Sequence, residues 1–177
     1  MDVHTAAAHS NTVTPASPQA KLEAIDQLMA RLELAPDGVI LDAPATPLDR
    51  AGVSQADGLT TAQSGLALCI KTADCQPVML AHSSGKYVAA LHVGWRGNRI
   101  NFHHSGTTAF CKHYGLNPAD LIAVRGPSLG PTAAEFINFD TEWGDEFRPW
   151  YNPNTRCMDL WALTRHQLKV VGLKPEN

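Results

Sequence analysis

The sequence predicts a domain that contains both helices and β-strands. Two apolar runs, Pro77–Ala81 and Tyr87–Val93, flank a Ser-Ser-Gly turn at residues 83–85, which favours a β-hairpin. Two other segments, Gln19–Leu34 and Asp159–Val171, place apolar residues three and four positions apart, as amphipathic helices do. Asp159 is the predicted N-cap of the second helix. At 177 residues, the chain is long enough for one domain with a substantial core.

The first third of the chain predicts a loose arm and two strands. Residues 1–18 are rich in Ala, Ser, Thr and Pro, which is typical of an arm, and residues 19–177 then form a single domain. Val39–Leu41 is predicted as a short strand. Residues 42–57 contain Pro and Gly breakers and are predicted as a loop. Leu66–Ile70 is a continuous apolar run, typical of a strand buried on both faces.

The second half predicts a helix, two strands and a tight loop. Asn98–Tyr114 is expected to be helical, and Leu121–Val124 and Phe136–Phe139 are expected to be strands. Between these strands, the GPSLGP segment at residues 126–131 forces a tight backbone excursion. Such a loop either presents bare N–H groups to an anion or only turns the chain. An aromatic patch near the C-terminus is expected in the core or in a lid: Trp143, Phe147, Trp150 and Tyr151.

Composition excludes several function classes. The chain is 44% hydrophobic and 18% charged, as globular proteins are, and its net charge of −3 provides no basic surface for nucleic acid. It has neither an apolar run of membrane-spanning length nor a signal segment, so no membrane partner and a cytoplasmic location are expected. The four cysteines are scattered, which favours free thiols over disulfides: Cys69, Cys75, Cys111 and Cys157.

The predicted hairpin brings two reactive side chains together. Asp74 and Cys75 precede its first strand, and His92 lies near the end of its second strand, so the two ends lie side by side. The imidazole of His92 could draw the proton from the Cys75 thiol and make a nucleophile. The thiolate and the imidazole could instead share a zinc ion. A half-buried cysteine and a hydrogen-bonded core histidine are the third alternative.

Four sequence blocks carry a resemblance to a known family. They are TADCQPVML, AALHVGWRG, RGPSLGP with the following Glu135-Phe136, and MDLWALTRHQL, within residues 56–172. Together they resemble the laccase-domain family, bacterial proteins described first as multicopper polyphenol oxidases and later as zinc-dependent purine nucleoside phosphorylases with adenosine deaminase activity. The resemblance implies an α+β fold with helix/sheet/sheet/helix layers, similar to the cysteine-hydrolase-like domain of a bacterial toxin.

The resemblance also implies a site. The family binds zinc through His, Cys and His, and Cys75 and His92 match two of these ligands. Arg96 matches the arginine of the GWRG block and would bind an anionic phosphate or a polarised substrate oxygen. Asp74 would orient Cys75 or His92, or act as a general base. Catalysis is thus assigned to Cys75, His92, Asp74 and Arg96, and substrate binding to Arg96, Gly126, Ser128 and Gly130.

The chain departs from the family where the first zinc-binding histidine is expected. A QVHG-like segment should follow the strand at Val39–Leu41, but the sequence there is LDAPATP. The third metal ligand is therefore unknown, with His9, His103, His104 or a residue of a neighbouring subunit in a homo-oligomer as alternatives. Zinc is expected to bind weakly or to be absent, because catalytic sites usually supply three protein ligands. The family's terminal segments are also largely missing, so the chain is similar to a shortened member.

The resemblance favours an enzyme that acts on a purine nucleoside, with phosphate as the second substrate. In deamination, a zinc-bound water would attack the base. Two alternatives are a metal-free hydrolase that uses Cys75 and His92, and a shortened non-catalytic relative that acts as a binding protein. Copper oxidation is disfavoured, because the sequence lacks the several His-Cys-His clusters that such centres need.

Overall fold

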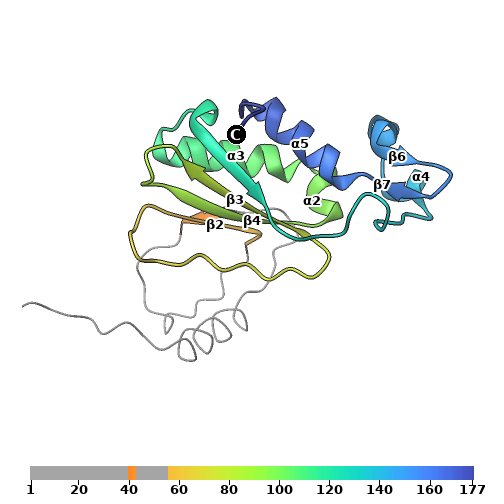
Figure 1. Ribbon diagram of the computed structural model, residues 1–177, viewed down its shortest axis with the longest axis horizontal. Helices are drawn as coiled ribbons and strands as arrows, with labels where there is room; N and C mark the ends of the chain where they lie inside the picture. The colour runs from red at the N-terminus through yellow and green to blue at the C-terminus, as the bar shows by residue number, and fades with distance from the viewer. Residues whose placement is uncertain (1–39, 43–55) are drawn as a thin grey trace, which may run out of the picture.

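The computed structural model describes residues 40–42 and 56–177 (Figure 1). The predicted arm, residues 1–18, and the predicted helix Gln19–Leu34 lie outside the described residues. The division into an arm and one domain of residues 19–177 therefore stays a prediction.

A five-stranded sheet with the order β1-β2-β4-β3-β5 forms the centre of the fold. β1 pairs in parallel with β2, and the other neighbours are antiparallel. The predicted hairpin is confirmed as β3 and β4, and the strands expected at Val39–Leu41 and Leu121–Val124 appear as β1 and β5, each within one residue. The strands are β1 (Ile40–Asp42), β2 (Gly58–Thr61), β3 (Gln76–His82), β4 (Val88–Val93) and β5 (Leu121–Arg125).

In the main sheet, one predicted strand was wrong and one strand was missed. Leu66–Ile70 is apolar but forms no strand. The physical reason is pairing: β2 and β3 occupy the two edges of β4, and β4 and β5 occupy those of β3, so neither hairpin strand has a free edge for this run. β2 lies instead at Gly58–Thr61, whose short GLTT sequence has no apolar alternation. Pairing with β4 defines this strand, with Gly58 opposite Leu91.

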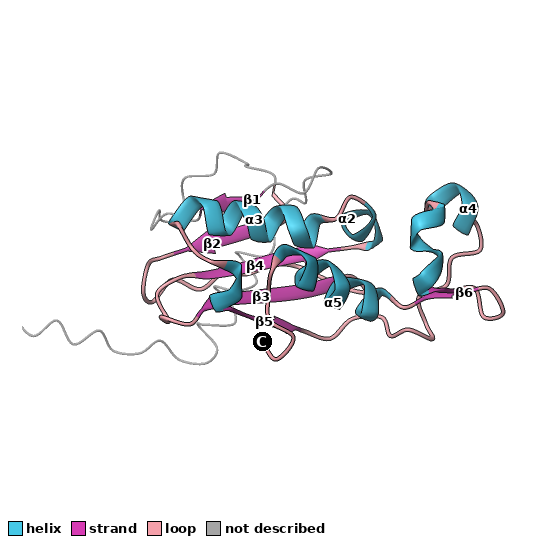
Figure 2. Ribbon diagram, turned by 90° about the horizontal axis from the view of Figure 1, so that it is seen from above, coloured by secondary structure: helices cyan, strands magenta, loops and turns pink. Residues whose placement is uncertain are grey.

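Helices cover one face of the sheet (Figure 2). They are α2 (Trp95–Arg99), α3 (Phe102–Tyr114) and α5 (Leu160–Val171). The single helix predicted over Asn98–Tyr114 was wrong at its start, because Asn101 adopts a left-handed conformation with φ of 58° and separates α2 from α3. The N-cap prediction is confirmed: the Asp159 side chain accepts the N–H of Ala162 at 2.8 Å. No helix in the described ranges combines the length and apolar character needed to cross a membrane.

The main core lies between this sheet face and the helices. Buried residues alternate along the hairpin, so that Val78 and Leu80 of β3 share a face with Leu91 and Val93 of β4. Phe102 and Phe110 of α3 pack with them and are fully buried. Side chains of the opposite parity point to the other face, where four large apolar residues are exposed: Met79, Val88, Ile122 and Val124.

A buried polar network joins the sheet to all three helices. The amide of Gln76, on β3, donates to the Asn98 side chain of α2 at 3.0 Å. Asn98 donates to both Thr164 and Gln167 of α5 at 3.3 Å. The Thr164 hydroxyl completes the ring of hydrogen bonds, because it donates to the side-chain oxygen Oε1 of Gln76 at 2.8 Å. Because each of these amides and the hydroxyl is satisfied inside the core, the network fixes the relative positions of the elements that carry them.

His103 of α3 completes this network as a neutral ring. Its Nε2 lies 2.9 Å from the Thr164 hydroxyl oxygen. The single hydroxyl hydrogen already goes to Gln76, so Nε2 must carry the hydrogen of the His103–Thr164 bond. Nδ1 is then an acceptor, and it is buried without a partner among the described residues. Burial lowers the pKa of His103 to about 3, because a protonated ring would be desolvated there.

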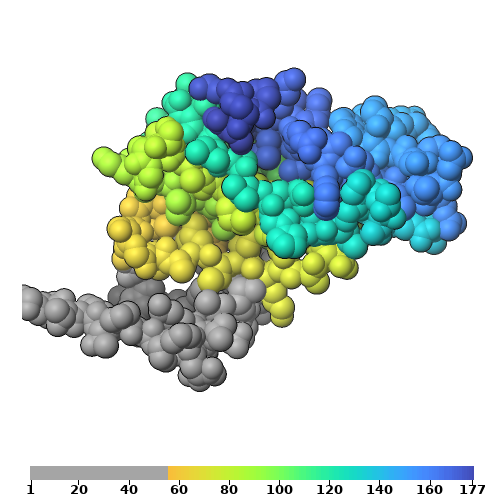
Figure 3. All heavy atoms as spheres, viewed as in Figure 1, coloured from red at the N-terminus to blue at the C-terminus, as the bar shows by residue number. Residues whose placement is uncertain are grey.

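An aromatic module extends from one end of the sheet (Figure 1) and forms one end of the molecular surface, at the right of the view (Figure 3). Its elements are α4 (Phe139–Glu142), η2 (Asp145–Trp150), β6 (Tyr151–Asn152) and β7 (Cys157–Met158), while η1 (Pro118–Asp120) precedes β5. The predicted strand at Phe136–Phe139 was wrong: α4 begins at Phe139, and the nearest pairing is an isolated bridge between Glu135 and Cys157. The predicted aromatic core is confirmed, with Trp143 and Phe147 buried.

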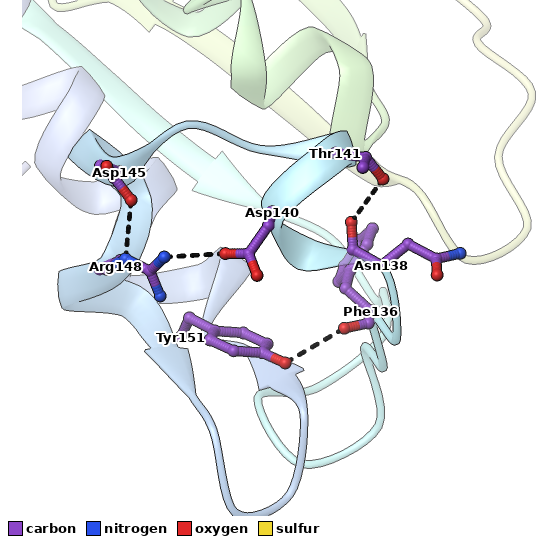
Figure 4. A network of polar contacts seen from close by, with 7 residues as sticks. All are labelled: Phe136, Asn138, Asp140, Thr141, Asp145, Arg148 and Tyr151. Carbon is purple, nitrogen blue, oxygen red and sulfur yellow. Dashed lines mark hydrogen bonds and ion pairs between the residues drawn. The ribbon is translucent and has the colours of Figure 1, made fainter.

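Polar contacts brace this module on its outside (Figure 4). Arg148 of η2 binds Asp140 of α4 and Asp145 at 2.8 Å each. The hydroxyl of Tyr151 donates to the carbonyl oxygen of Phe136 at 3.2 Å. The ion pairs are exposed, so they add little to the stability and mainly set the orientation of η2 against α4.

The depressed pKa of His103 predicts acid sensitivity. In the unfolded chain the ring titrates near pH 6.5, so below that pH the unfolded state binds one proton more than the folded state. Stability is fully present above pH 6.5 and falls as the pH drops from 6.5 toward 3, by about 1.4 kcal/mol per pH unit from this residue alone. Urea unfolding between pH 7.5 and pH 5 measures the slope.

Two variants make this prediction specific. In His103→Gln, the unfolding free energy should depend less steeply on pH, by the amount that corresponds to one bound proton. This holds whatever the effect of the change on stability at pH 7.5. The same change at His104, the neighbouring half-buried residue, should leave the slope unchanged. Equal slopes for the wild type and His103→Gln would show that the buried ring does not cause the acid sensitivity.

Candidate functional site

Three strands align a row of side chains on the sheet face opposite the helices. His92 of β4 pairs with Pro77 of β3. On its other side, the pairing of Gly58 with Leu91 places Asp57 opposite His92. Residues directly opposite each other in antiparallel strands share a face. Asp57, His92 and Pro77 therefore lie in one row across the sheet.

Asp57 holds the His92 ring. The carboxylate oxygen Oδ1 lies 3.4 Å from Nδ1, and both side chains are shielded from solvent, with exposures of 14% and 11%. The backbone N–H of His92 also donates to the Asp57 carbonyl oxygen at 2.7 Å. The ring contact is long for a hydrogen bond, so its effect is to orient the imidazole. With a hydrogen on Nδ1 directed at the carboxylate, Nε2 is the nitrogen available to a ligand.

Cys75 lies diagonally across from His92 on the same face. The register that pairs Gln76 with Val93 places Cys75 opposite Gly94, two positions beyond His92. A Cβ at Gly94 would lie 3.0 Å from the Cys75 Sγ, so a larger residue there would crowd the thiol. Diagonal neighbours across antiparallel strands are close enough for longer side chains to interact. The hairpin thus places the half-buried thiol and the imidazole on a common face.

We call the region around Cys75 and His92 the Cys75–His92 corner, and its electrostatics oppose a free thiolate. Burial raises the pKa of the Cys75 thiol above its usual value, and the negative charges of Asp74 and Asp57 raise it further. Cys75 is therefore a protonated thiol at neutral pH unless a cation is close by. The influence of Asp57 also shows that this carboxylate acts on both Cys75 and His92.

Arg96 is an exposed residue at the start of α2. Its guanidinium carbon lies 4.4 Å from the centre of the Trp95 ring, which itself contacts Phe136 and Trp143 of the aromatic module. The Trp95 ring thus packs against the Arg96 guanidinium, and this cation–π contact helps to position the arginine. That Arg96 binds substrate next to Cys75 stays a prediction.

The GPSLGP loop lies against the residues before β3. The N–H of Gly126 donates to the Pro77 carbonyl oxygen at 2.8 Å, and the N–H of Leu129 donates to the Asp74 carbonyl oxygen at 3.1 Å. These two N–H groups are therefore used within the protein. The Ser128 hydroxyl accepts hydrogen bonds from Arg125 and Trp161. Substrate binding by Gly126, Ser128 and Gly130 stays a prediction.

The candidate third metal ligands are not brought to this corner. His103 lies in the buried network on the helix-covered face, against Thr164. His9 lies outside the described residues, and His104 has no contact that places it near Cys75. In the described ranges, no group of three His, Cys, Asp or Glu side chains has a metal-binding arrangement. Cys75 and His92 thus provide two donors, with Asp57 behind the second.

Comparison with known proteins identifies the family. The family described as "Multi-copper polyphenol oxidoreductase laccase" matches residues 3–177. The chain belongs to this laccase family. The resemblance seen in the four sequence blocks is therefore confirmed.

Curated relatives in the laccase family are named as phosphorylases. A purine nucleoside phosphorylase of Pseudomonas aeruginosa is 31% identical over 166 residues, which cover 88% of this chain and 67% of the relative. The human purine nucleoside phosphorylase LACC1 is 30% identical over 126 residues, which cover 68% of this chain and 29% of the human protein. A purine nucleoside phosphorylase of Rickettsia conorii is 32% identical over a match that covers 69% of this chain and 53% of the relative. Most such matches therefore cover about half of the relative or less.

Solved structures of other bacterial proteins share the fold. The Neisseria meningitidis protein NMB0706 superposes with a TM-score of 0.67 at 25% identity, covering 92% of this chain and 70% of that one. A hypothetical protein of Bacillus licheniformis, YfiH, gives 0.66 at 24% identity, covering 82% and 60%. These similarities support the α+β class, with mixed strand pairing and helices on one face of the main sheet.

Asp57 is the site residue that the sequence did not single out. It precedes a strand that has no apolar pattern, and its relation to His92 exists only through the pairing of β2 with β4. The only signal available was an isolated carboxylate at the end of the predicted loop of residues 42–57.

The like charges around Cys75 predict a change in thiol reactivity. Asp74→Asn removes one negative charge, so the pKa of Cys75 should fall and alkylation by iodoacetamide at neutral pH should become faster. Mass spectrometry of the Cys75 peptide measures the rate against pH. Asp120→Asn, an exposed change at the opposite end of the β3–β5 pair, is the matched control and should not alter the profile. A pH profile that is the same for Asp74→Asn and the wild type would contradict the assigned charge effect.

Proposed function

We propose that this chain is a purine nucleoside phosphorylase that uses a zinc ion bound by Cys75 and His92. The observation that carries the proposal is the arrangement at the end of the hairpin: a half-buried thiol and an imidazole on one face, with Asp57 behind the imidazole. The relatives' names support the substrate class, a purine nucleoside with phosphate.

The charges favour a metal over a free cysteine nucleophile. Two carboxylates and burial keep Cys75 protonated, which is the opposite of what thiol nucleophiles need. The same negative surroundings favour a divalent cation, which would stabilise the thiolate and compensate for Asp57 and Asp74. This observation ranks the zinc site above the metal-free Cys-His hydrolase.

The donor set fits zinc in kind. Thiolate sulfur and imidazole nitrogen are its usual ligands, and a carboxylate behind the imidazole is the usual orienting partner. When bound, zinc would supply an acidic water or polarise a substrate oxygen. Among the described residues there are two donors, so a third ligand from elsewhere in the chain, from solvent or from a second subunit would complete the site.

The remaining residues take positioning roles in the proposal. Arg96, extended on Trp95, would bind phosphate, and Asp74 would act as a base or orient Cys75. The GPSLGP loop would border the nucleoside. Adenosine deamination at the same centre and the four-layer, toxin-type hydrolase fold are finer parts of the same proposal, which follow from family resemblance.

A non-catalytic binding role is the second candidate. The donor count favours it, because the described residues contain no group of three metal-binding side chains. Turnover separates the two candidates.

Zinc titration and a nucleoside assay test the proposal. Isothermal titration should show one equivalent of zinc, bound more weakly than at a three-ligand site, and inosine with phosphate should then be cleaved to hypoxanthine. Cys75→Ala and His92→Ala should each abolish both zinc binding and turnover. Cys69→Ala, which changes another half-buried cysteine, should preserve both.

The other outcomes each favour a rival. Turnover without zinc that still requires Cys75 would support the metal-free hydrolase. A folded protein that binds no zinc and turns over neither inosine nor adenosine would support the binding protein. Zinc binding that survives in Cys75→Ala would show that the metal site lies elsewhere.

A further inference from the structure

A basic cavity lies on the helix-covered side of the sheet, between β5 and α5. Its volume is about 380 Å³, within the range of small-molecule sites. Ala123 and Arg125 of β5 form one wall, and Trp161 and Arg165 of α5 form another. The C-terminal residues close it: the main-chain oxygen of Asn177 accepts the N–H of Ala123 at 3.3 Å, and the C-terminus lies beside β5 (Figures 1 and 2).

Four cations surround this cavity. Arg125, Arg165, Lys169 and Lys174 all line it, and no Asp or Glu side chain belongs to its lining in the described part of the chain. Arg165, Lys169 and Lys174 are exposed, and none forms an ion pair with a described residue. This clustering stands out because the chain as a whole carries a net charge of −3. An excess of cations around a concave surface raises the local concentration of anions.

Arg125 is held in a fixed position within the wall. Its guanidinium stacks on the Trp161 ring, with 3.8 Å between the guanidinium carbon and the ring centre. Its Nη1 donates to the Ser128 hydroxyl at 2.9 Å and to the Gly126 carbonyl oxygen at 3.1 Å. The Trp161 indole N–H donates to the same hydroxyl at 3.1 Å. A guanidinium fixed in this way loses little conformational entropy when it binds a ligand.

The hydroxyl of Ser128 adds a donor to this wall. It accepts two N–H groups, from Arg125 and from Trp161, so its own hydrogen is available to donate. Asp159 is the acid that acts on Arg125, but its Oδ1 already accepts the Ala162 N–H as the N-cap of α5. The burial of Arg125 and the charge of Arg165 lower the pKa of Arg125, and the charge of Asp159 only partly offsets them.

We propose that this cavity is a binding site for a phosphate dianion, either free or as the head of a small phosphomonoester. The fixed Arg125, the Ser128 hydroxyl and the exposed cations of α5 and the C-terminal segment supply hydrogen-bond donors, most of them charged, which suit a multiply charged oxyanion. The volume exceeds that of a phosphate ion and leaves room for an ester group.

This site is separate from the Cys75–His92 corner. Arg125 pairs with Val78, whose side chain is buried on the helix-covered face. Cys75 and His92 belong to the opposite face, so the sheet stands between the two sites. The GPSLGP loop touches both, through Ser128 on one side and through the Leu129 N–H and the Asp74 carbonyl oxygen on the other. The proposal does not depend on the proposed phosphorylase activity.

A titration of the full chain followed by nuclear magnetic resonance tests the site. The indole N–H of Trp161 is a local probe, assigned with Trp161→Phe. Inorganic phosphate should shift this resonance saturably, and potassium chloride at equal ionic strength should not. Arg165→Gln with Lys169→Gln should weaken phosphate binding by about tenfold or more, the factor for losing a charge-assisted hydrogen bond.

A matched control and a second ligand complete the test. Arg99→Gln with Lys112→Gln removes the same charge from exposed positions on α2 and α3 and should not change the affinity. Glycerol 3-phosphate, which has no base, distinguishes the sources: tighter binding than phosphate indicates a phosphomonoester, and equal or weaker binding indicates free phosphate. A shift that does not saturate, or one that both double variants weaken equally, would overturn the proposal.

Discussion

Much of this structure depends on where the side chain of Gln76 points. It is fully buried on the helix-covered face, where Asn98 and Thr164 hold both ends of its amide. Because successive residues of a strand alternate between faces, this anchor directs Cys75 to the opposite face. The pairing of β3 with β4 then sets His92 on that face as well. The candidate site is therefore positioned by a polar network that lies behind it and contains none of its residues.

The candidate site concentrates negative charge around sulfur and imidazole. Asp57 contacts His92 and influences Cys75, and Asp74 adds to the same effect. Such a site is poorly suited to a free thiolate and well suited to a cation. The other face of the sheet has the opposite character, with four cations around one cavity. The thickness of the sheet separates these two environments. Successive residues of a strand point to opposite faces, so Arg125 of β5 faces the cavity while its neighbour Val124 faces the other side.

The sequence was informative where local chemistry determined the structure. The Ser-Ser-Gly turn between apolar runs predicted β3 and β4, and the capping aspartate predicted the start of α5 at Asp159. It failed where pairing decided the outcome. Leu66–Ile70 has strand composition, but neither hairpin strand offers it a free edge. Gly58–Thr61 lacks that composition and is a strand because β4 pairs with it. Asp57 was missed for the same reason, and the turn at Asn101 came from a backbone conformation that Asn tolerates better than most residues.

The polar network also has a consequence for the order of folding. Thr164 and Gln76 are 88 positions apart in the sequence, and Thr164 and His103 are 61 apart. Bonds over such distances close large loops, so they form only after the hairpin and α3 have assembled and α5 docks. Contacts that form after the folding transition state act mainly on the unfolding rate. We therefore expect the network to slow unfolding more than it speeds folding, and so to set the lifetime of the folded hairpin end.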